Sequence, residues 1–222
     1  MYTLHIGNKN YSSWSLRPWL LMQQLEIPFE EVLHVFNQED FSRFSPTARV
    51  PCLEDGERLI WDSLAIVEYL AENHPAVWPW NKVERAWARS AAAEMHAGFS
   101  ALRDYCSMSC GVRVRLFEQS ETLLKDVQRL DQLWCNGLTQ FGGPYLAGEI
   151  FTAVDAFYAP MAFRQQSFNF QLSEQAMAYS QRLLELPAMQ AWYEAAIAET
   201  WRDEPHDNLI RTRGEITQDF RA

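Results

Sequence analysis

The sequence is short of cysteine, of long apolar runs and of positive charge. Its four cysteines in 222 residues show no disulfide-framework spacing. No run reaches the roughly 18 apolar residues that a membrane-spanning helix needs. The first residues, MYTLHIGNK, lack the basic segment and apolar core of a signal peptide. From these absences we expect a cytoplasmic protein whose cysteines stay reduced.

Acidic residues outnumber basic residues by 29 to 19, and the formal net charge is −10. Such a chain is a poor partner for nucleic acids and for anionic membrane surfaces. The five histidines form no cluster, and Cys106 and Cys110, four residues apart, supply too few ligands for a metal. We therefore expect no metal site, no nucleic-acid partner and no membrane partner.

Apolar patterns in the first third of the chain predict a small α/β domain over residues 1–77. Strand patterns occur at residues 2–6 and 30–35, on either side of a helix of about 15 residues. A strand, helix, strand unit implies parallel pairing of the two strands. The Asp55-Gly56 pair between two short apolar runs predicts a β-hairpin, and residues 62–73 have helical spacing.

Residues 74–81, HPAVWPWN, contain two X-Pro steps and no periodicity, which is typical of a linker. We place this linker at about residues 74–84. Beyond it, apolar residues recur near the helical period of 3.6, so we expect an all-helical domain over residues 85–222. The helices predicted in this part of the chain cover residues 83–103, 116–141, 152–166, 174–185 and 187–201.

Three serines open the helix that we predict within residues 11–25, YSSWSLRPWLLMQQL. The body of this helix is apolar nearly all round, as expected of a helix buried on more than one side. Hydroxyls at its N-terminus either cap the free N–H groups or hold a bound anion. Pro18 fits only a first turn, so the helix begins near Ser15, or at Ser13 with a distorted turn, and Ser12 lies in the approach loop.

Four short motifs occur in an order and spacing that is specific when they are taken as a set. They are Ser12-Ser13-Trp14-Ser15, Arg49-Val50-Pro51, Asp62-Ser63 and Thr152-Ala153-Val154-Asp155. With the order of strands and helices, they make essentially the whole chain resemble the cytosolic glutathione S-transferases, in particular zeta- and theta-like bacterial members with an active-site serine. The resemblance implies a thioredoxin-like N-terminal domain, an all-α C-terminal domain, glutathione as co-substrate and a homodimer.

The resemblance also implies where glutathione binds. In the family, a cis bond before the residue matching Pro51 exposes the backbone of Val50, which then pairs with the cysteinyl backbone of glutathione. Ser63, assisted by Asp62, would hold the γ-glutamyl end, although the family usually has Glu or Gln at position 62. Arg49 is a candidate for the glycyl carboxylate. From the residues alone, a trans bond that starts a strand and an ordinary helix cap explain these motifs equally well.

Ser12 and Ser13 are the candidate catalytic residues, and both, with Trp14, are candidates for glutathione contact. A glutathione thiol with a pKa of about 8.5 is mostly protonated at neutral pH, so a hydroxyl that donates to the sulfur favours the reactive thiolate. Ser12 matches the serine that zeta-type members assign to the thiol, and Trp14 replaces their cysteine. Which serine faces the thiol stays open, as does a purely capping role.

The expected activity is transfer of the glutathione thiolate to a small hydrophobic electrophile in a pocket between the domains. Tyr11, Met95, Phe99 and Arg103 are candidates for the pocket walls, although core packing is the more common role for helical Met and aromatic residues. The alternatives are a glutathione-dependent cis–trans isomerase of the maleylacetoacetate type and a non-catalytic glutathione-binding or scaffold protein. The absence of cysteine from residues 11–25 argues against disulfide chemistry at this site.

Overall fold

The computed structural model describes residues 1–222, and its N-terminal part is a four-stranded sheet in the order β2-β1-β3-β4. β1 pairs with β2 in parallel and with β3 antiparallel, as the predicted strand, helix, strand unit requires. β3 and β4 form the predicted hairpin, in which Gly56 has a φ of 63°. The α/β domain is therefore confirmed. Its strands are β1 (Tyr2–Gly7), β2 (Phe29–His34), β3 (Cys52–Asp55) and β4 (Arg58–Ile60).

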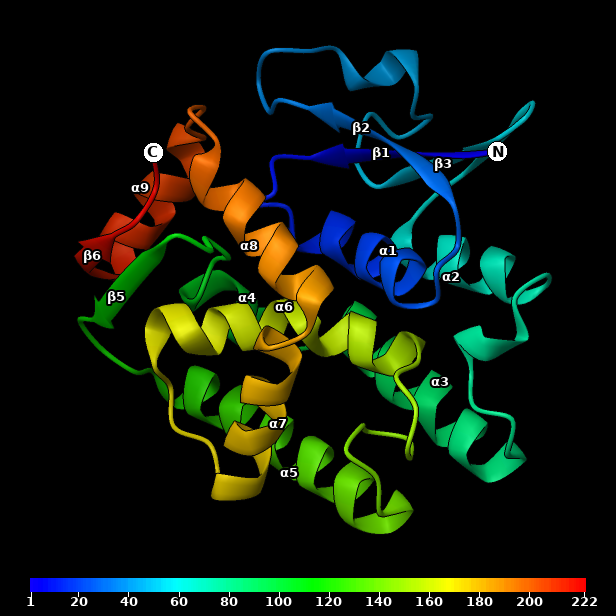
Figure 1. Ribbon diagram of the computed structural model, residues 1–222. Coiled ribbons are helices and arrows are strands. Elements are labelled where there is room, and N and C mark those ends of the chain that lie inside the picture. The colour runs from blue at the N-terminus through cyan, green and yellow to red at the C-terminus, as the bar shows by residue number, and fades with distance from the viewer.

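Two helices, α1 (Ser13–Gln24) and α2 (Ser63–Ala71), lie between this sheet and the rest of the molecule (Figure 1). α1 begins at Ser13, the earlier of the two predicted starts, so Pro18 lies inside the helix. Proline has no N–H, and the carbonyl of Trp14 therefore lacks its usual partner four residues on. Short 3-10 turns are η1 (Phe41–Arg43), after β2, and η2 (Pro75–Val77), within the proposed linker.

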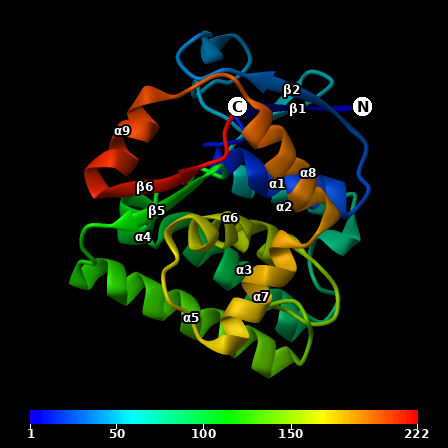
Figure 2. The same cartoon turned by 60° about the vertical axis from the view of Figure 1, so that its left-hand side comes forward.

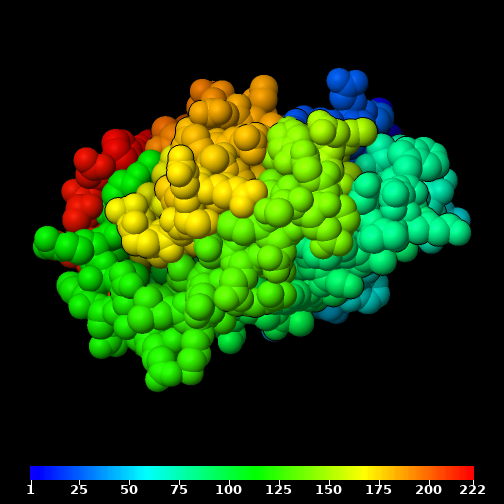
Figure 3. Space-filling model, turned by 90° about the horizontal axis from the view of Figure 1, so that it is seen from below, coloured from blue at the N-terminus to red at the C-terminus, as the bar shows by residue number.

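The remaining helices form the second part of the molecule. Seen from below, its green and yellow segments make up most of the visible surface (Figure 3). None of its helices has the combination of length and apolar character that crossing a bilayer requires. These helices are α3 (Lys82–Ala97), α4 (Ser100–Tyr105), α5 (Glu121–Phe141), α6 (Ala153–Phe168), α7 (Glu174–Leu184), α8 (Pro187–Ala198) and α9 (Glu204–Arg213). The domain division near residues 74–84 stays a proposal, with α3 beginning inside that range.

The fold class is confirmed, but the helical region departs from the prediction in three details. The predicted helix at residues 83–103 breaks into α3 and α4, because Phe99 adopts a φ of 55° after Gly98. Residue 116 ends a strand, β5 (Val112–Leu116), instead of starting a helix. β5 pairs antiparallel with β6 (Gly214–Asp219), so a two-stranded ribbon accompanies the helices (Figure 2). The third departure is α9, which follows the predicted last helix.

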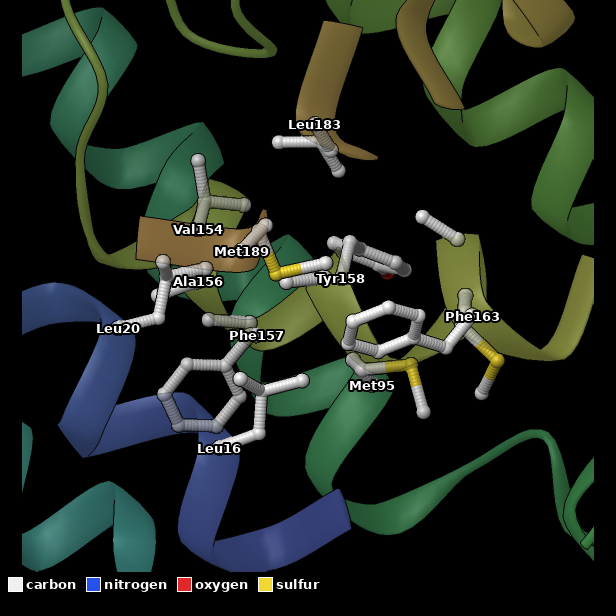
Figure 4. Close-up of a cluster of buried hydrophobic side chains, with 14 of the residues drawn as sticks. Leu16, Leu20, Met95, Val154, Ala156, Phe157, Tyr158, Phe163, Leu183 and Met189 are labelled. Carbon is white, nitrogen blue, oxygen red and sulfur yellow. The ribbon is translucent and has the colours of Figure 1, made fainter. Parts of the chain in front are cut away.

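Helix α6 lies at the centre of the core. Every residue of α6 except Gln166 is buried, and α6 packs against both α1 and α3. Side chains of four other helices converge on it (Figure 4). The labelled residues of this cluster are Leu16, Leu20, Met95, Val154, Ala156, Phe157, Tyr158, Phe163, Leu183 and Met189. The apolar core is thus continuous from the first domain into the helical region, and it fixes the two parts against each other.

Thr152 and Asp155, which belong to the fourth of the short motifs, form a capping box at the start of α6. The Asp155 carboxylate accepts the backbone N–H of Thr152 at 2.9 Å, the N–H of Leu146 at 3.0 Å and the hydroxyl of Tyr179 at 2.8 Å. Asp155 is fully buried, and this burial raises its pKa to about 6, against the lowering effect of its donors. Through these hydrogen bonds, the buried Asp155 carboxylate holds the loop before α6 and helix α7 against the start of α6.

Candidate functional site

A cavity of about 740 Å³ lies where the N-terminal domain meets the helical region. The start of α1, the segment after β2 and the approach to β3 form its first wall. The opposite wall comes from α4, from α6 and from the beginning of α9. The serine-rich mouth of α1 and the Val50 segment, which are nearly 40 residues apart in the chain, therefore face one common space, as the resemblance predicts.

The two candidate serines both line this cavity but differ in their hydrogen bonds. The Ser12 hydroxyl donates to the Ser15 hydroxyl over 2.7 Å, and Ser15 also accepts the N–H of Gly7 at 3.1 Å. The Ser13 hydroxyl accepts from Nη2 of Arg164 at 3.2 Å and donates to no atom of the chain. Neither serine caps the helix through its side chain, since no such bond is present at Ser12. The proton of Ser13 is therefore free for a ligand, whereas that of Ser12 is engaged.

The bond between Val50 and Pro51 is cis, so this prediction is confirmed. Val50 lines the cavity, and its backbone N–H and C=O make no hydrogen bond within the chain. An extended ligand can therefore pair with both groups, as a strand does at a sheet edge. Arg49 also lines the cavity with an exposed side chain, while Pro51 is buried behind this segment and does not line it.

Asp62 and Ser63 stand at the start of α2, outside the lining of the cavity. Asp62 acts as a helix cap, because its carboxylate accepts the N–H of Leu64 at 2.9 Å. The same carboxylate lies 3.3 Å from Nε2 of His96. Ser63 is fully buried, and its hydroxyl has no hydrogen-bond partner. A buried hydroxyl without a partner is costly, so the Ser63 hydroxyl is available to a ligand that reaches the start of this helix.

Of the four residues predicted for the pocket walls, Tyr11 and Arg103 line the cavity and Met95 and Phe99 do not. Met95 and Phe99 belong to the buried apolar core, because the break after Gly98 turns Phe99 inward, with its ring 6.2 Å from that of Tyr158. The Tyr11 hydroxyl donates to Asp207 at 3.1 Å and accepts from Arg221 at 3.1 Å. Burial, and then the Asp207 charge, raise the pKa of Tyr11, so it stays a neutral wall residue.

Two arginines, Arg17 and Arg103, pack on the ring of Trp14, and Arg164 lies near them. The guanidinium carbon of Arg17 lies 4.1 Å, and that of Arg103 5.1 Å, from the centroid of the indole ring. Burial, followed by repulsion from Arg164 and Arg103, lowers the pKa of Arg17 to about 9. Burial likewise lowers the pKa of Arg164 to about 10, and Arg103 contributes to that lowering. At neutral pH all three arginines therefore stay charged.

Several cavity residues were not among the predicted site residues. Arg164 stands inside α6, and Pro205, His206 and Leu209 stand on α9. The start of α9 is recognisable in the sequence, because an Asp followed two residues later by Pro is typical of a helix N-terminus. In the structure, Asp203 accepts the N–H of His206, and Pro205 lies in the first turn. Arg164 could not be predicted in this way, since the sequence pattern of one arginine in an apolar helix is the same whether its side chain faces a cavity or a neighbouring backbone.

The four cysteines lie outside the lining of the cavity. All four are free thiols, and burial raises the pKa of Cys52 to about 11 and of Cys106 to about 12. No group of three or more His, Cys, Asp or Glu residues in the chain is arranged to hold a metal ion. The cavity therefore presents hydroxyls, backbone groups, arginines and aromatic rings.

The comparisons with known proteins find glutathione S-transferases and probable maleylacetoacetate isomerases among the similar proteins. A family model described as glutathione S-transferase, N-terminal domain, matches residues 11–73. A probable maleylacetoacetate isomerase of Caenorhabditis elegans is 28% identical over 173 residues, which cover 72% of this chain and 77% of that protein. A protein of the same name from Vibrio cholerae is 29% identical over 157 residues, covering 67% and 73%.

The solved structures show the same fold over nearly the full length. A theta class glutathione S-transferase from Xanthomonas axonopodis pv. citri, with glutathione bound, has a TM-score of 0.62 at 23% identity and covers 86% of this chain and 96% of that chain. A diazinon-metabolizing glutathione S-transferase from the silkworm Bombyx mori has a TM-score of 0.70 at 20% identity, covering 88% and 97%.

Proposed function

Because the chain belongs to the glutathione S-transferase family, we propose that it joins the thiolate sulfur of glutathione to a small electrophile. The observation that carries this proposal is the common cavity between the mouth of α1 and the Val50 backbone. One end of that cavity offers free serine and backbone groups to a tripeptide, and the other offers room for a second molecule. Glutathione is then the co-substrate.

In the proposed binding mode, glutathione lies along the N-terminal domain. The backbone of Val50 pairs with the cysteinyl residue of glutathione, which is supported by its free N–H and C=O. The γ-glutamyl carboxylate accepts from the buried Ser63 hydroxyl, and Asp62 attracts the γ-glutamyl amine. Arg49 pairs with the glycyl carboxylate. The thiol then reaches Ser12 and Ser13 at the N-terminus of α1.

We propose that Ser13 donates its hydroxyl proton to the sulfur. This is supported by the bond from Arg164 to Ser13 Oγ, which directs the proton of Ser13 away from Arg164, and by the engagement of the Ser12 proton with Ser15. In the reaction, the thiol proton passes to solvent and the sulfur electron pair forms a bond to the electrophilic carbon. The bond from that carbon to its leaving group breaks with its own electron pair. Positioning and thiolate stabilisation supply the catalysis.

A calorimetric titration with glutathione alone tests the proposal most directly. We expect saturable binding to the wild-type protein and binding at least about tenfold weaker in Ser63→Ala, since a hydrogen bond to a charged group is worth about 1.5–3 kcal/mol. The control variant is Ser120→Ala, which removes the serine that caps the exposed start of α5. It should bind glutathione with the wild-type affinity. Absence of any binding to the wild-type protein would contradict the proposal.

A second candidate is the cis–trans isomerase reaction, because two of the relatives are named probable maleylacetoacetate isomerases. In such a reaction glutathione adds to the substrate and leaves again, so it is not consumed. A titration of total thiol during turnover separates the two candidates: stoichiometric loss of thiol belongs to transfer, and constant thiol to isomerisation.

We propose that the protein forms a homodimer in the cytoplasm. The two large apolar side chains exposed at the end of β4, Leu59 at 39% and Trp61 at 43%, support an interface on the N-terminal domain. The four free cysteines support a reducing compartment.

Sedimentation equilibrium should report about 52 kDa, twice the 25.8 kDa of the chain. A Trp61→Glu variant should shift this mass towards the monomer, whereas a wild-type mass near 26 kDa at all concentrations would exclude the dimer.

A further inference from the structure

The helical side of the cavity carries two arginines, Arg103 and Arg164, that form no ion pair with a carboxylate of the chain. The charged side chains along the cavity are those of Arg49, Arg103, Arg164 and Asp104, and the His206 ring, which also lines it, pairs with Asp203. The Asp104 carboxylate pairs with Arg213, which lies outside the lining. Arg49, Arg103 and Arg164 take part in none of the ion pairs of the chain. In a chain whose net charge is −10, this local excess of positive charge favours a bound anion.

The proposed position of glutathione leaves part of this charge unmatched. Its glycyl carboxylate faces Arg49 and its γ-glutamyl end faces Ser63, both on the N-terminal domain. Arg164 stands beside the thiolate, because its Nη2 lies 3.2 Å from Ser13 Oγ. The other donors of Arg164 point to backbone carbonyls, with Nε 2.8 Å from the carbonyl of Cys106. Arg103, on α4, has no group of glutathione to face.

Arg103 is held in place with two of its donors free. Its Nη1 donates to the carbonyl of His96 at 3.3 Å, and its guanidinium lies over the Trp14 ring. Its Nε and Nη2 donate to no atom of the chain. A third arginine, Arg17, packs on the same indole, is 1% exposed and has Nε and Nη1 without partners. A fixed guanidinium with a free edge binds a carboxylate through two parallel hydrogen bonds at a small entropic cost.

We propose that the electrophile carries a carboxylate, or an anionic group of similar size, and that this group binds the Nε and Nη2 edge of Arg103. The inference rests on the proposed transferase function and narrows its substrates from hydrophobic electrophiles to anionic ones. Arg164 and Arg17 add positive charge behind the bound group. The rings of Trp14 and Phe36, which also line the cavity, provide apolar contact for a flat or unsaturated substrate body.

A matched pair of electrophiles tests the charge directly: 4-chloro-3,5-dinitrobenzoate and 4-chloro-3,5-dinitrobenzamide. Both lose chloride to the glutathione thiolate, and they have nearly the same size. Each kcat/KM is divided by the rate constant of the same reaction without enzyme, which removes the difference in intrinsic reactivity. We expect the wild-type protein to favour the benzoate at least about tenfold, and Arg103→Gln to bring this ratio close to one. Arg58→Gln removes an exposed arginine outside the cavity and should keep the wild-type ratio.

Binding of the two preformed conjugates, in which the glutathione sulfur already carries the benzoate or benzamide ring, tests the same contact without turnover. In a calorimetric titration, the benzoate conjugate should bind about tenfold more tightly, and Arg103→Gln should abolish the difference. Equal normalised rates and equal affinities in the wild-type protein would overturn the inference and leave the transferase proposal standing. Failure of both conjugates and of glutathione itself to bind would overturn the two together.

Discussion

Ser13→Ala should lower kcat/KM for conjugation by at least about 100-fold, the usual cost of losing one donor to a developing or stabilised anion. The hydroxyl of Ser13 accepts from Arg164 and donates to no atom of the chain, so its proton is the one available to the sulfur. Ser12→Ala should lower kcat/KM only about fivefold, because it removes only the hydrogen bond to Ser15, whose net contribution is about 1 kcal/mol. Steady-state kinetics at saturating glutathione give both values.

Ser12→Ala is thus the matched control for Ser13→Ala, since each removes one hydroxyl from the same turn. The thiolate absorbance of bound glutathione, followed against pH, adds a readout that positioning alone does not change. The apparent pKa of the bound thiol should rise in Ser13→Ala and stay near the wild-type value in Ser12→Ala. The reverse order of the two variants, in rate and in thiol pKa, would assign the sulfur to Ser12 instead.

The N-terminal domain could be predicted from sequence because its signals are local. Asp55-Gly56 specifies a hairpin, Asp62 caps the helix that follows, and an apolar helix between two strand patterns implies parallel pairing. The cis bond at Pro51 came from the resemblance alone, since trans is the common state of X-Pro bonds. Each of these features depends on residues within a few positions of one another or on a family pattern.

The opposite wall of the cavity depends on tertiary contacts that no local pattern encodes. Met95, Phe99 and Arg103 share one helical spacing, yet the break after Gly98 sends Phe99 into the core while Arg103 lines the cavity. The bond between Ser13 and Arg164 joins residues 151 positions apart. The β5 strand does carry a local signal, because Val-Arg-Val-Arg-Leu alternates with period two, but a ribbon also needs a partner strand, and β6 lies about 100 residues later.

Asp155→Ala should lower the free energy of unfolding at pH 7 by about 3–5 kcal/mol, the largest stability effect that we expect from one side chain. The substitution leaves the N–H groups of Leu146 and Thr152 and the hydroxyl of Tyr179 buried without their acceptor. Ser120→Ala removes the cap of the exposed start of α5, which is a single bond of 3.2 Å, and should cost only about 1 kcal/mol. Urea unfolding curves of the two variants measure this contrast.

The effect of Asp155→Ala should also depend on pH in a defined direction. Burial raises the pKa of Asp155 from 3.8 to about 6, so between these values the folded protein binds more protons at this site than the unfolded chain does. The extra stability from the protonated carboxyl is therefore fully present below about pH 4 and is lost as the pH rises through 6. The difference in the free energy of unfolding between wild type and Asp155→Ala should widen by about 2–3 kcal/mol from pH 7 to pH 4, because each unit of pKa shift is worth roughly 1.4 kcal/mol. A constant difference from pH 7 to pH 4 would mean that the hydrogen bonds to the carboxylate offset its burial, so that the pKa of Asp155 is not raised.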